Sequence, residues 1–145
     1  MENKKRKICI VTANRAEYSR LKSIIDGVLK HPKLELSVVI TGSHLLEKYG
    51  NTATDIKEDG FEIDYQMYME LDGNNLCTMA KSIGIAISDL ATYFDNKKVD
   101  AVIVMGDRYD IFSVAIVASV MNIPVIHVQG GEITGTIDES IRHAI

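Results

Sequence analysis

Acidic and basic side chains gather at a few points of the sequence, each shortly after an apolar run. Asp107 and Arg108 follow the run that ends at Met105, and Glu132 follows two glycines after the run that ends at Val128. A carboxylate beside a substrate can accept or donate a proton, and a guanidinium can bind phosphate oxygens in pairs. These residues therefore predict acid–base chemistry on an anionic substrate.

Another such loop, Thr12 to Glu17, follows the first apolar run and opens a helix. It lacks the glycine pattern of dinucleotide-binding folds and places Arg15 at the start of the helix. Amides at a helix start and a guanidinium together make a diphosphate site. Asn14 and Glu17 have the spacing of a capping box. We predict that Asn14 and Glu17 cap the helix and that Arg15 binds the ligand.

Some of the charged residues also have a structural explanation. Asp110 falls in the first turn of an expected helix, where the helix dipole favours negative charge, so we expect a structural role. Asp107 could be the N-cap of that helix, but the neighbouring Arg108 favours a functional role. Thr136 and Glu139 have capping-box spacing, which predicts that Glu139 is structural.

The remaining candidates carry weaker signals. Glu132 has no capping role that the pattern assigns, and Asp138 and Arg142 lie four residues apart, as in an ordinary surface salt bridge. His44 and His127 are near the same loops but not at metal-ligand spacing. We expect both histidines to be hydrogen-bonded polar groups.

Composition excludes several classes of function. The 145 residues include 16 Lys and Arg against 20 Asp and Glu, so the formal charge of −4 gives no general attraction to nucleic acid or to an anionic membrane. The basic N-terminal tail is interpreted as a solubilising segment, and no export signal or membrane span is visible. Cys9 and Cys77 have no disulfide or zinc spacing and are expected to be reduced core thiols. We therefore expect a cytoplasmic protein.

Strand and helix patterns alternate along the chain, which predicts a doubly wound parallel sheet of the α/β class within one domain. The expected strands cover residues 7–12, 36–41, 62–67, 100–105 and 123–128. The expected helices cover residues 21–29, 51–60, 76–94 and 111–121. Ligands bind beyond the carboxyl ends of the strands in such sheets, where the charged loops lie.

Three of these segments support further expectations. The runs 100–105 and 123–128 are almost wholly apolar, as in central strands, and an apolar stripe from Leu76 to Phe94 predicts the buried face of the longest helix. Residues 111–121 are apolar nearly all round, so that helix is expected to be buried or covered by a second subunit. The sequence stops inside a helical pattern that starts near Asp138, so we expect the chain to be part of a longer protein.

Longer blocks of the sequence carry a family resemblance. These blocks are TANRAEYSRL, TGSHLLEKYGNT, VMGDRYDIFSVAIVASVMNIPVIHVQGGE and TGTIDESIRHAI. They resemble the hydrolysing UDP-N-acetylglucosamine 2-epimerases of sialic acid biosynthesis, both the bacterial capsule type and the epimerase half of the bifunctional animal enzyme. The resemblance covers the whole chain.

That resemblance implies the first of two Rossmann-like domains in a glycosyltransferase B-like fold, with a UDP-sugar bound between the domains of a homo-oligomeric enzyme. UDP is eliminated as the C2 proton is removed, and water then adds to the 2-acetamidoglucal; no metal or redox cofactor is implied. The family's acidic catalytic positions fall on Asp107, Glu132 and Asp138. Its nucleotide-contacting positions fall on Arg15, Ser19 and Arg108, with Arg142 and His44 as further substrate contacts.

Other functions fit parts of the same pattern. A hydrolysing epimerase that acts on UDP-diacetylbacillosamine would share the fold and the loops. A glycosyltransferase of the same architecture is disfavoured by the two acid-bearing loops. A non-catalytic module that pairs through residues 111–121 is a third alternative, and the 145 residues alone are expected to show no turnover because the family takes part of its uridine and phosphate site from a second domain.

Overall fold

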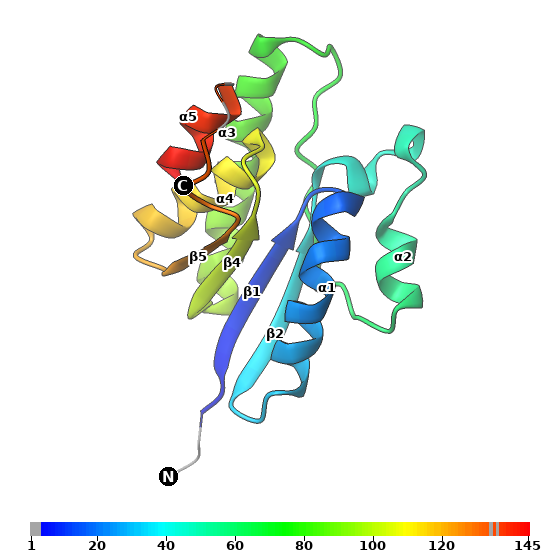
Figure 1. Ribbon diagram of the computed structural model, residues 1–145, viewed down its shortest axis with the longest axis vertical. Helices are drawn as coiled ribbons and strands as arrows, with labels where there is room; N and C mark the ends of the chain where they lie inside the picture. The colour runs from blue at the N-terminus through cyan, green and yellow to red at the C-terminus, as the bar shows by residue number, and fades with distance from the viewer. Residues whose placement is uncertain (1–3, 134, 136) are drawn as a thin grey trace.

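The computed structural model describes residues 4–133, 135 and 137–145, and its centre is a parallel sheet of five strands (Figure 1). The strand order is β3-β2-β1-β4-β5, and each neighbouring pair is parallel. This is the order of a Rossmann-type sheet, so the predicted α/β class is confirmed. The strands are β1 (Arg6–Thr12), β2 (Leu34–Ile40), β3 (Tyr65–Gln66), β4 (Ala101–Met105) and β5 (Val125–Val128).

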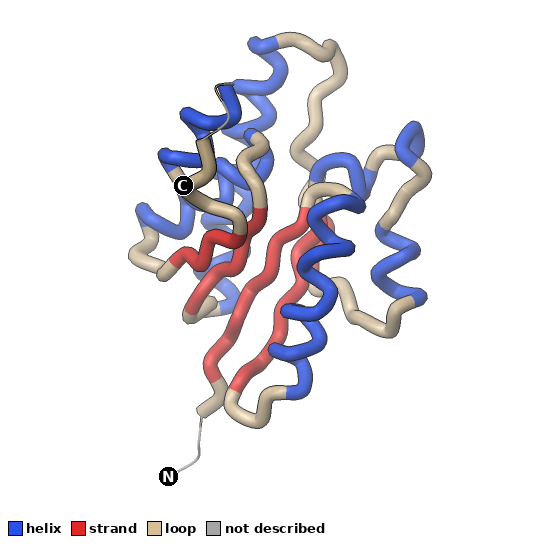
Figure 2. The backbone as a smooth tube through the Cα atoms, viewed as in Figure 1, coloured by secondary structure: helices blue, strands red, loops and turns tan. Residues whose placement is uncertain are grey.

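Helices cover both faces of the sheet, as Figure 2 shows. Helices α1 and α2 pack on one face, and α3 and α4 pack on the other. The short α5 lies against α4. The bounds are α1 (Arg15–Lys30), η1 (Gly42–Leu45), η2 (Glu47–Tyr49), α2 (Ala53–Glu58), α3 (Leu76–Lys97), α4 (Tyr109–Val120) and α5 (Ile137–Ala144).

The central strand β1 shows why the sheet has helices on both sides. Cys9 and Val11 are buried with α3 and α4, whereas Ile8 and Ile10 are buried with α1 and α2. Successive side chains of a strand point to opposite faces, so an apolar run without alternation needs cover on both faces. Burial of these side chains places the carboxyl end of β1 at the middle of one edge of the sheet.

The buried face of α3 differs from the predicted stripe. Leu90 and Phe94 of the predicted stripe are buried, but Leu76 is 83% exposed and Met79 is 36% exposed, and the buried face also includes Ser82, Ala86 and Tyr93. Figure 1 shows the first turns of α3 extending past the carboxyl ends of the strands. Those turns have no sheet beneath them, so helical spacing alone placed the stripe wrongly at this end.

Strand β5 is the last in the strand order of the described residues, and Ile126 on it is 48% exposed. Two smaller expectations are wrong. Leu29, expected on the buried face of α1, is 53% exposed. Cys9 is a buried thiol as predicted, but Cys77 lies on the exposed start of α3 and is not a core residue.

The position of helix α4 in the core explains why its sequence is apolar nearly all round. Its side chains Ile111, Val114, Val117 and Ala118 are buried in the core formed with α3 and the sheet. The first of the two expected explanations, burial within the chain, is therefore confirmed for this helix. Among the described residues, no helix combines the length and the hydropathy that crossing a membrane requires.

Candidate functional site

The candidate site lies where the direction of strand addition reverses. Strands β1 and β4 are neighbours, and the helices that follow them, α1 and α4, lie on opposite faces of the sheet. The loops after these strands therefore diverge and leave a crevice at the carboxyl edge, which is where open α/β sheets bind ligands. Arg15 is the first residue of α1, and Arg108 is the N-cap residue of α4.

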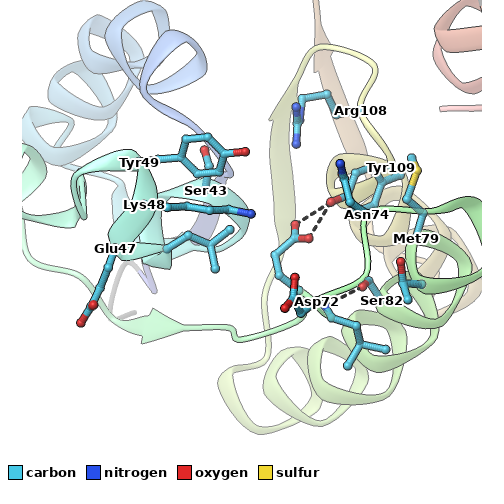
Figure 3. Close-up of a pocket in the computed structure, with 14 residues that line it drawn as sticks. Ser43, Glu47, Lys48, Tyr49, Asp72, Asn74, Met79, Ser82, Arg108 and Tyr109 are labelled. Atoms are coloured by element: carbon cyan, nitrogen blue, oxygen red, sulfur yellow. Dashed lines mark hydrogen bonds between the residues drawn. The ribbon is translucent and has the colours of Figure 1, made fainter.

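Two adjoining clefts open at this edge, one of about 600 Å³ and one of about 360 Å³. Both are lined by Ser43, Tyr49 and Arg108. Figure 3 shows the larger cleft between the 3₁₀ segment that carries Tyr49 and the segment that carries Arg108 and Tyr109. The smaller cleft adds Asn14, Arg15, Ala16 and Thr52.

Arg15 and Arg108 thus reach one cleft from two different strand ends. The Arg15 side chain is 77% exposed, and its Nε lies 3.3 Å from a carboxylate oxygen of Asp55. The Arg108 Nε lies 3.2 Å from Asp110. With the N-termini of α1 and α4 on either side, this arrangement is suited to binding the charge of a diphosphate.

The predicted cap of α1 is confirmed, with one difference in geometry. The Asn14 side chain accepts the N–H of Glu17 at 3.0 Å, and the Glu17 carboxylate accepts the side-chain amide of Asn14 at 2.6 Å. Glu17 also accepts the backbone N–H of Ala13 at 2.8 Å, one residue before the cap position. Because Asn14 and Glu17 satisfy the helix start between them, Arg15 is left to point outward.

Glu17 lies beneath this loop and is only 7% exposed. Burial, followed by the nearby Asp110 charge, raises the pKa of Glu17 from 4.5 to about 8. The hydrogen bonds from Ala13 and Asn14 act in the opposite direction but do not outweigh burial. The first turn of α1, beside the candidate anion site, therefore contains a carboxyl group whose pKa is raised to about 8.

Glutamine in place of Glu17 is expected to flatten the fall in stability between pH 6.5 and 8. A raised folded-state pKa means that the folded protein binds the proton more tightly, so stability falls as pH rises from 4.5 to about 8. His44 has a lowered pKa and opposes this effect only below 6.5. Over the 1.5 pH units between pH 6.5 and 8, Glu17 lowers the free energy of unfolding of the wild-type protein by at most about 2 kcal/mol.

Urea denaturation of wild-type and Glu17→Gln proteins at pH 6.5 and pH 8 measures this difference. The wild-type free energy of unfolding should drop between the two pH values, and that of the variant should change less. An equal drop in both proteins would show that Glu17 is not the group that titrates.

A second group of polar contacts joins α5 to the loops after β4 and β5. The Arg142 guanidinium, 7% exposed, donates to the Asp107 carboxylate and, at 2.7 Å, to the carbonyl oxygen of Glu132. The predicted surface position of Arg142 is wrong, because α5 folds back and buries this side chain. The N-cap alternative for Asp107 is also wrong, since Arg108 occupies that position.

Two further acids of this segment, Glu132 and Asp138, face solvent, and neither they nor Asp107 are among the residues that line the two clefts. The side chains of Glu132 and Asp138 are exposed, and Asp138 lies in the first turn of α5. Glu139 accepts the backbone N–H of Gly135, which agrees with a structural role. Thr136, the expected partner of Glu139 in a capping box, lies outside the described residues.

The two histidines are hydrogen-bonded polar groups, as predicted. His44 is fully buried, with Nε2 at 3.1 Å from the Thr12 hydroxyl and Nδ1 at 2.6 Å from that of Thr52. Burial lowers the pKa of His44 to about 4. His127 lies 2.6 Å from the carbonyl oxygen of Gly106. His44 itself lines neither cleft, but Thr52, to which it is hydrogen-bonded, lines the smaller one, so a direct substrate contact of His44 stays a prediction from the resemblance.

Ser19 is one nucleotide-contacting position that the fold does not bring to either cleft. It lies on an exposed part of α1, and its hydroxyl donates to the carbonyl oxygen of Ala16 at 3.0 Å. The residues lining the two clefts do not include it. Ser19 therefore stays a prediction that rests on the resemblance alone.

Sequence reasoning missed several residues of the larger cleft. The Tyr109 hydroxyl donates to the Glu70 carboxylate, with oxygen–oxygen distances of 2.6 and 2.8 Å, and this bond forms part of the cleft wall (Figure 3). Tyr49 and Lys48 lie on the opposite wall. The block TGSHLLEKYGNT contained a signal for the second pair, but Glu70 follows a weak strand with no local pattern.

Comparisons with known proteins show which family the chain resembles. A protein-family model described as UDP-N-acetylglucosamine 2-epimerase matches residues 27–145. The chain is 39% identical, over 97% of its length, to a hydrolysing UDP-N,N'-diacetylbacillosamine 2-epimerase of Legionella pneumophila. It is 33% identical, over the same share, to a UDP-N-acetylglucosamine 2-epimerase of Neisseria meningitidis. The chain spans 37% and 36% of the length of these relatives.

Solved structures agree on the fold. The Neisseria meningitidis UDP-GlcNAc 2-epimerase bound to UDP-GlcNAc matches 95% of this chain and 37% of its own, with a TM-score of 0.81 and 23% identity. Likeness of this kind confirms the predicted class, a Rossmann-like domain of a glycosyltransferase B-like fold. Since the family model covers most of the chain and both relatives align with nearly all of it, the chain belongs to the UDP-N-acetylglucosamine 2-epimerase family.

Proposed function

We propose that the chain provides the phosphate-binding and acidic part of the active site of a hydrolysing 2-epimerase that converts UDP-N-acetylglucosamine and water to N-acetylmannosamine and UDP. The observation that carries this proposal is the meeting of Arg15 and Arg108 at one cleft, with Asp107 next to Arg108 in sequence. A diphosphate leaving group needs that positive charge, and proton transfer at carbon needs the carboxylate.

In the proposed reaction, a carboxylate removes the C2 proton while the bond between C1 and the diphosphate oxygen breaks. UDP leaves with the bonding electrons, and the sugar becomes a 2-acetamidoglucal. Water then adds its oxygen to C1 and a proton returns to C2 on the opposite face, which gives N-acetylmannosamine. Arg15, Arg108 and the amides at the starts of α1 and α4 stabilise the departing phosphate charge, and Asp107, Glu132 and Asp138 supply the proton-transfer groups.

A second substrate is supported by a specific observation. Relatives from Legionella pneumophila and Campylobacter jejuni, each 39% identical to the chain, are described as hydrolysing 2-epimerases of diacetylbacillosamine nucleotides. The relative described as a UDP-N-acetylglucosamine 2-epimerase is 33% identical. UDP-N,N'-diacetylbacillosamine is therefore the alternative substrate of the same reaction.

A product assay with both nucleotide sugars tests the proposal. The proteins compared are the chain alone and a chimera in which residues 1–145 replace the aligned segment of the Legionella pneumophila relative. We expect no turnover by the chain alone, and free 2-epimerised sugar plus UDP from the chimera. Release of N-acetylmannosamine favours the first substrate, and release of the diacetamido sugar alone favours the second. Transfer of the sugar to an acceptor, without free sugar, would contradict both.

A further inference from the structure

Asp110 is a fully buried carboxylate to which the proposed reaction gives no role. It lies in the first turn of α4, and its Oδ1 accepts the N–H of Ile111 at 3.0 Å. Its Oδ2 accepts the Arg108 Nε at 3.2 Å. The backbone of Gly42, after β2, packs so closely that a Cβ there would lie 3.0 Å from Oδ2. The carboxylate therefore sits where the loops after β2 and β4 meet.

Asp110 is buried beside two other acidic side chains, and Arg108 is the cation bonded to it. Glu17 faces it from α1 and Glu70 from the segment after β3, and both are acids. Burial raises the pKa of Asp110, while the adjacent Arg108 opposes that rise. A buried carboxylate without a partner is strongly unfavourable, so the folded protein favours the arrangement in which Arg108 stays bonded to Asp110.

We propose that Asp110 is a positioning residue, which binds Arg108 through Nε and so directs the terminal nitrogens of its guanidinium into the two clefts. An arginine held at Nε retains two terminal amino groups that can bind two phosphate oxygens. Arg108 lines both clefts, as expected of a side chain fixed between them. The inference rests on the proposed function, because it assigns to Arg108 the diphosphate of the substrate.

The close approach of Gly42 supports this role. Gly42 has a φ of 55°, and a Cβ would also lie 2.9 Å from the carbonyl oxygen of Ala13. The loop after β2 therefore needs glycine at this point to close over the Asp110 carboxylate. The Gly42 backbone covers the Asp110 end of this ion pair, while the Arg108 side chain remains 46% exposed and lines both clefts.

A plain helix-start role for Asp110 makes a different prediction. An acid in the first turn of a helix adds stability through the helix dipole and the N–H of Ile111, without any effect on Arg108. Such a role would make Asp110→Asn less stable and leave ligand binding unchanged. The state of the Arg108 guanidinium therefore separates the two roles.

The experiment compares the wild-type chain with Asp110→Asn by NMR. The Arg108 Nε–Hε signal is assigned from its absence in Arg108→Lys. Each protein is then titrated with UDP and with pyrophosphate. We expect the Asp110→Asn change to shift the Arg108 signal and to weaken UDP binding at least tenfold. Combining it with Arg108→Lys should weaken binding no further than Arg108→Lys alone. Asp59→Asn is the matched control, because Asp59 pairs with Lys22 away from both clefts and should keep wild-type affinity.

A measurement on the wild-type chain keeps the proposal testable if Asp110→Asn does not fold. Arg15 also pairs through Nε, with Asp55, but its side chain is 77% exposed. The Arg108 Nε–H should exchange with solvent at least tenfold more slowly than that of Arg15. Equal exchange rates, or an Asp110→Asn variant with unchanged signal and affinity, would overturn the proposal. Absence of UDP and pyrophosphate binding by the wild-type chain would instead count against the proposed function, since the Arg108 signal is read without ligand.

Discussion

Asparagine in place of Asp107 is expected to lower the turnover of the chimera by on the order of a hundredfold or more, because it removes a carboxylate that we propose transfers a proton. The change keeps the shape of the side chain. The measurement is the rate of free sugar release at saturating nucleotide sugar. A rate within a few-fold of wild type would contradict the assignment of Asp107.

The Asp107 variant needs a structural control because its carboxylate also binds Arg142, which is only 7% exposed. Removing one partner of a buried charge pair costs about 3–5 kcal/mol in the least favourable case. Arg142→Met removes the same ion pair but keeps the Asp107 carboxylate, and we expect a partial loss of rate because Arg142 also holds the Glu132 backbone and is an expected substrate contact. If both variants lose stability alike but only Asp107→Asn loses a hundredfold in rate, the loss belongs to the carboxylate and not to the docking of α5.

Glutamine in place of Glu132 is expected to reduce turnover by a similar factor, on the order of a hundredfold, with little change in stability. The Glu132 side chain is exposed, and Arg142 binds the backbone carbonyl of this residue, which the substitution leaves intact. Loss of rate can therefore be read directly as loss of a proton-transfer group. Sugar release and the urea midpoint of the same preparation are the two measurements.

Glu139→Gln is the matched control for this variant. Glu139 lies in the same segment of chain and has a structural contact to Gly135. It should retain the turnover of the unsubstituted chimera. A Glu132→Gln variant that is as active as Glu139→Gln would exclude Glu132 from the reaction.

Local patterns were sufficient to predict the strand ends and the first helix cap. Residues 7–12 and 100–105 are apolar because helices cover both faces of the sheet, so the turns after Thr12 and Met105 could be located from the sequence. The spacing of Asn14 and Glu17 predicted the cap because all its contacts lie within a few residues. Parallel strands then bring their carboxyl ends to one edge, and this placed Arg15 and Arg108 together.

Contacts between residues far apart in the chain could not be predicted in this way. Arg142 and Asp107 are 35 residues apart, and no periodic pattern indicates that α5 folds back over the loop after β4. Tyr109 and Glu70 are 39 residues apart and come from different layers. The exposure of the first turns of α3 could not be predicted for the same reason. Helical spacing shows which face of a helix is apolar, but not how far the sheet extends beneath that face.

Because Arg142 contacts two loops, the positions of Asp107 and Glu132 depend on the fraction of molecules in which α5 is docked. Helix α5 spans eight residues, and its contacts hold Asp107 and the backbone of Glu132 in one arrangement. Elements held by few contacts open locally at a smaller free-energy cost than the whole domain. Each opening of α5 releases Asp107 from Arg142, so the fraction of molecules with this ion pair formed equals the fraction in which α5 is docked. A partner or ligand that binds only the docked form would thereby raise the share of molecules in which Asp107 and the Glu132 backbone are held together, without touching an acidic side chain.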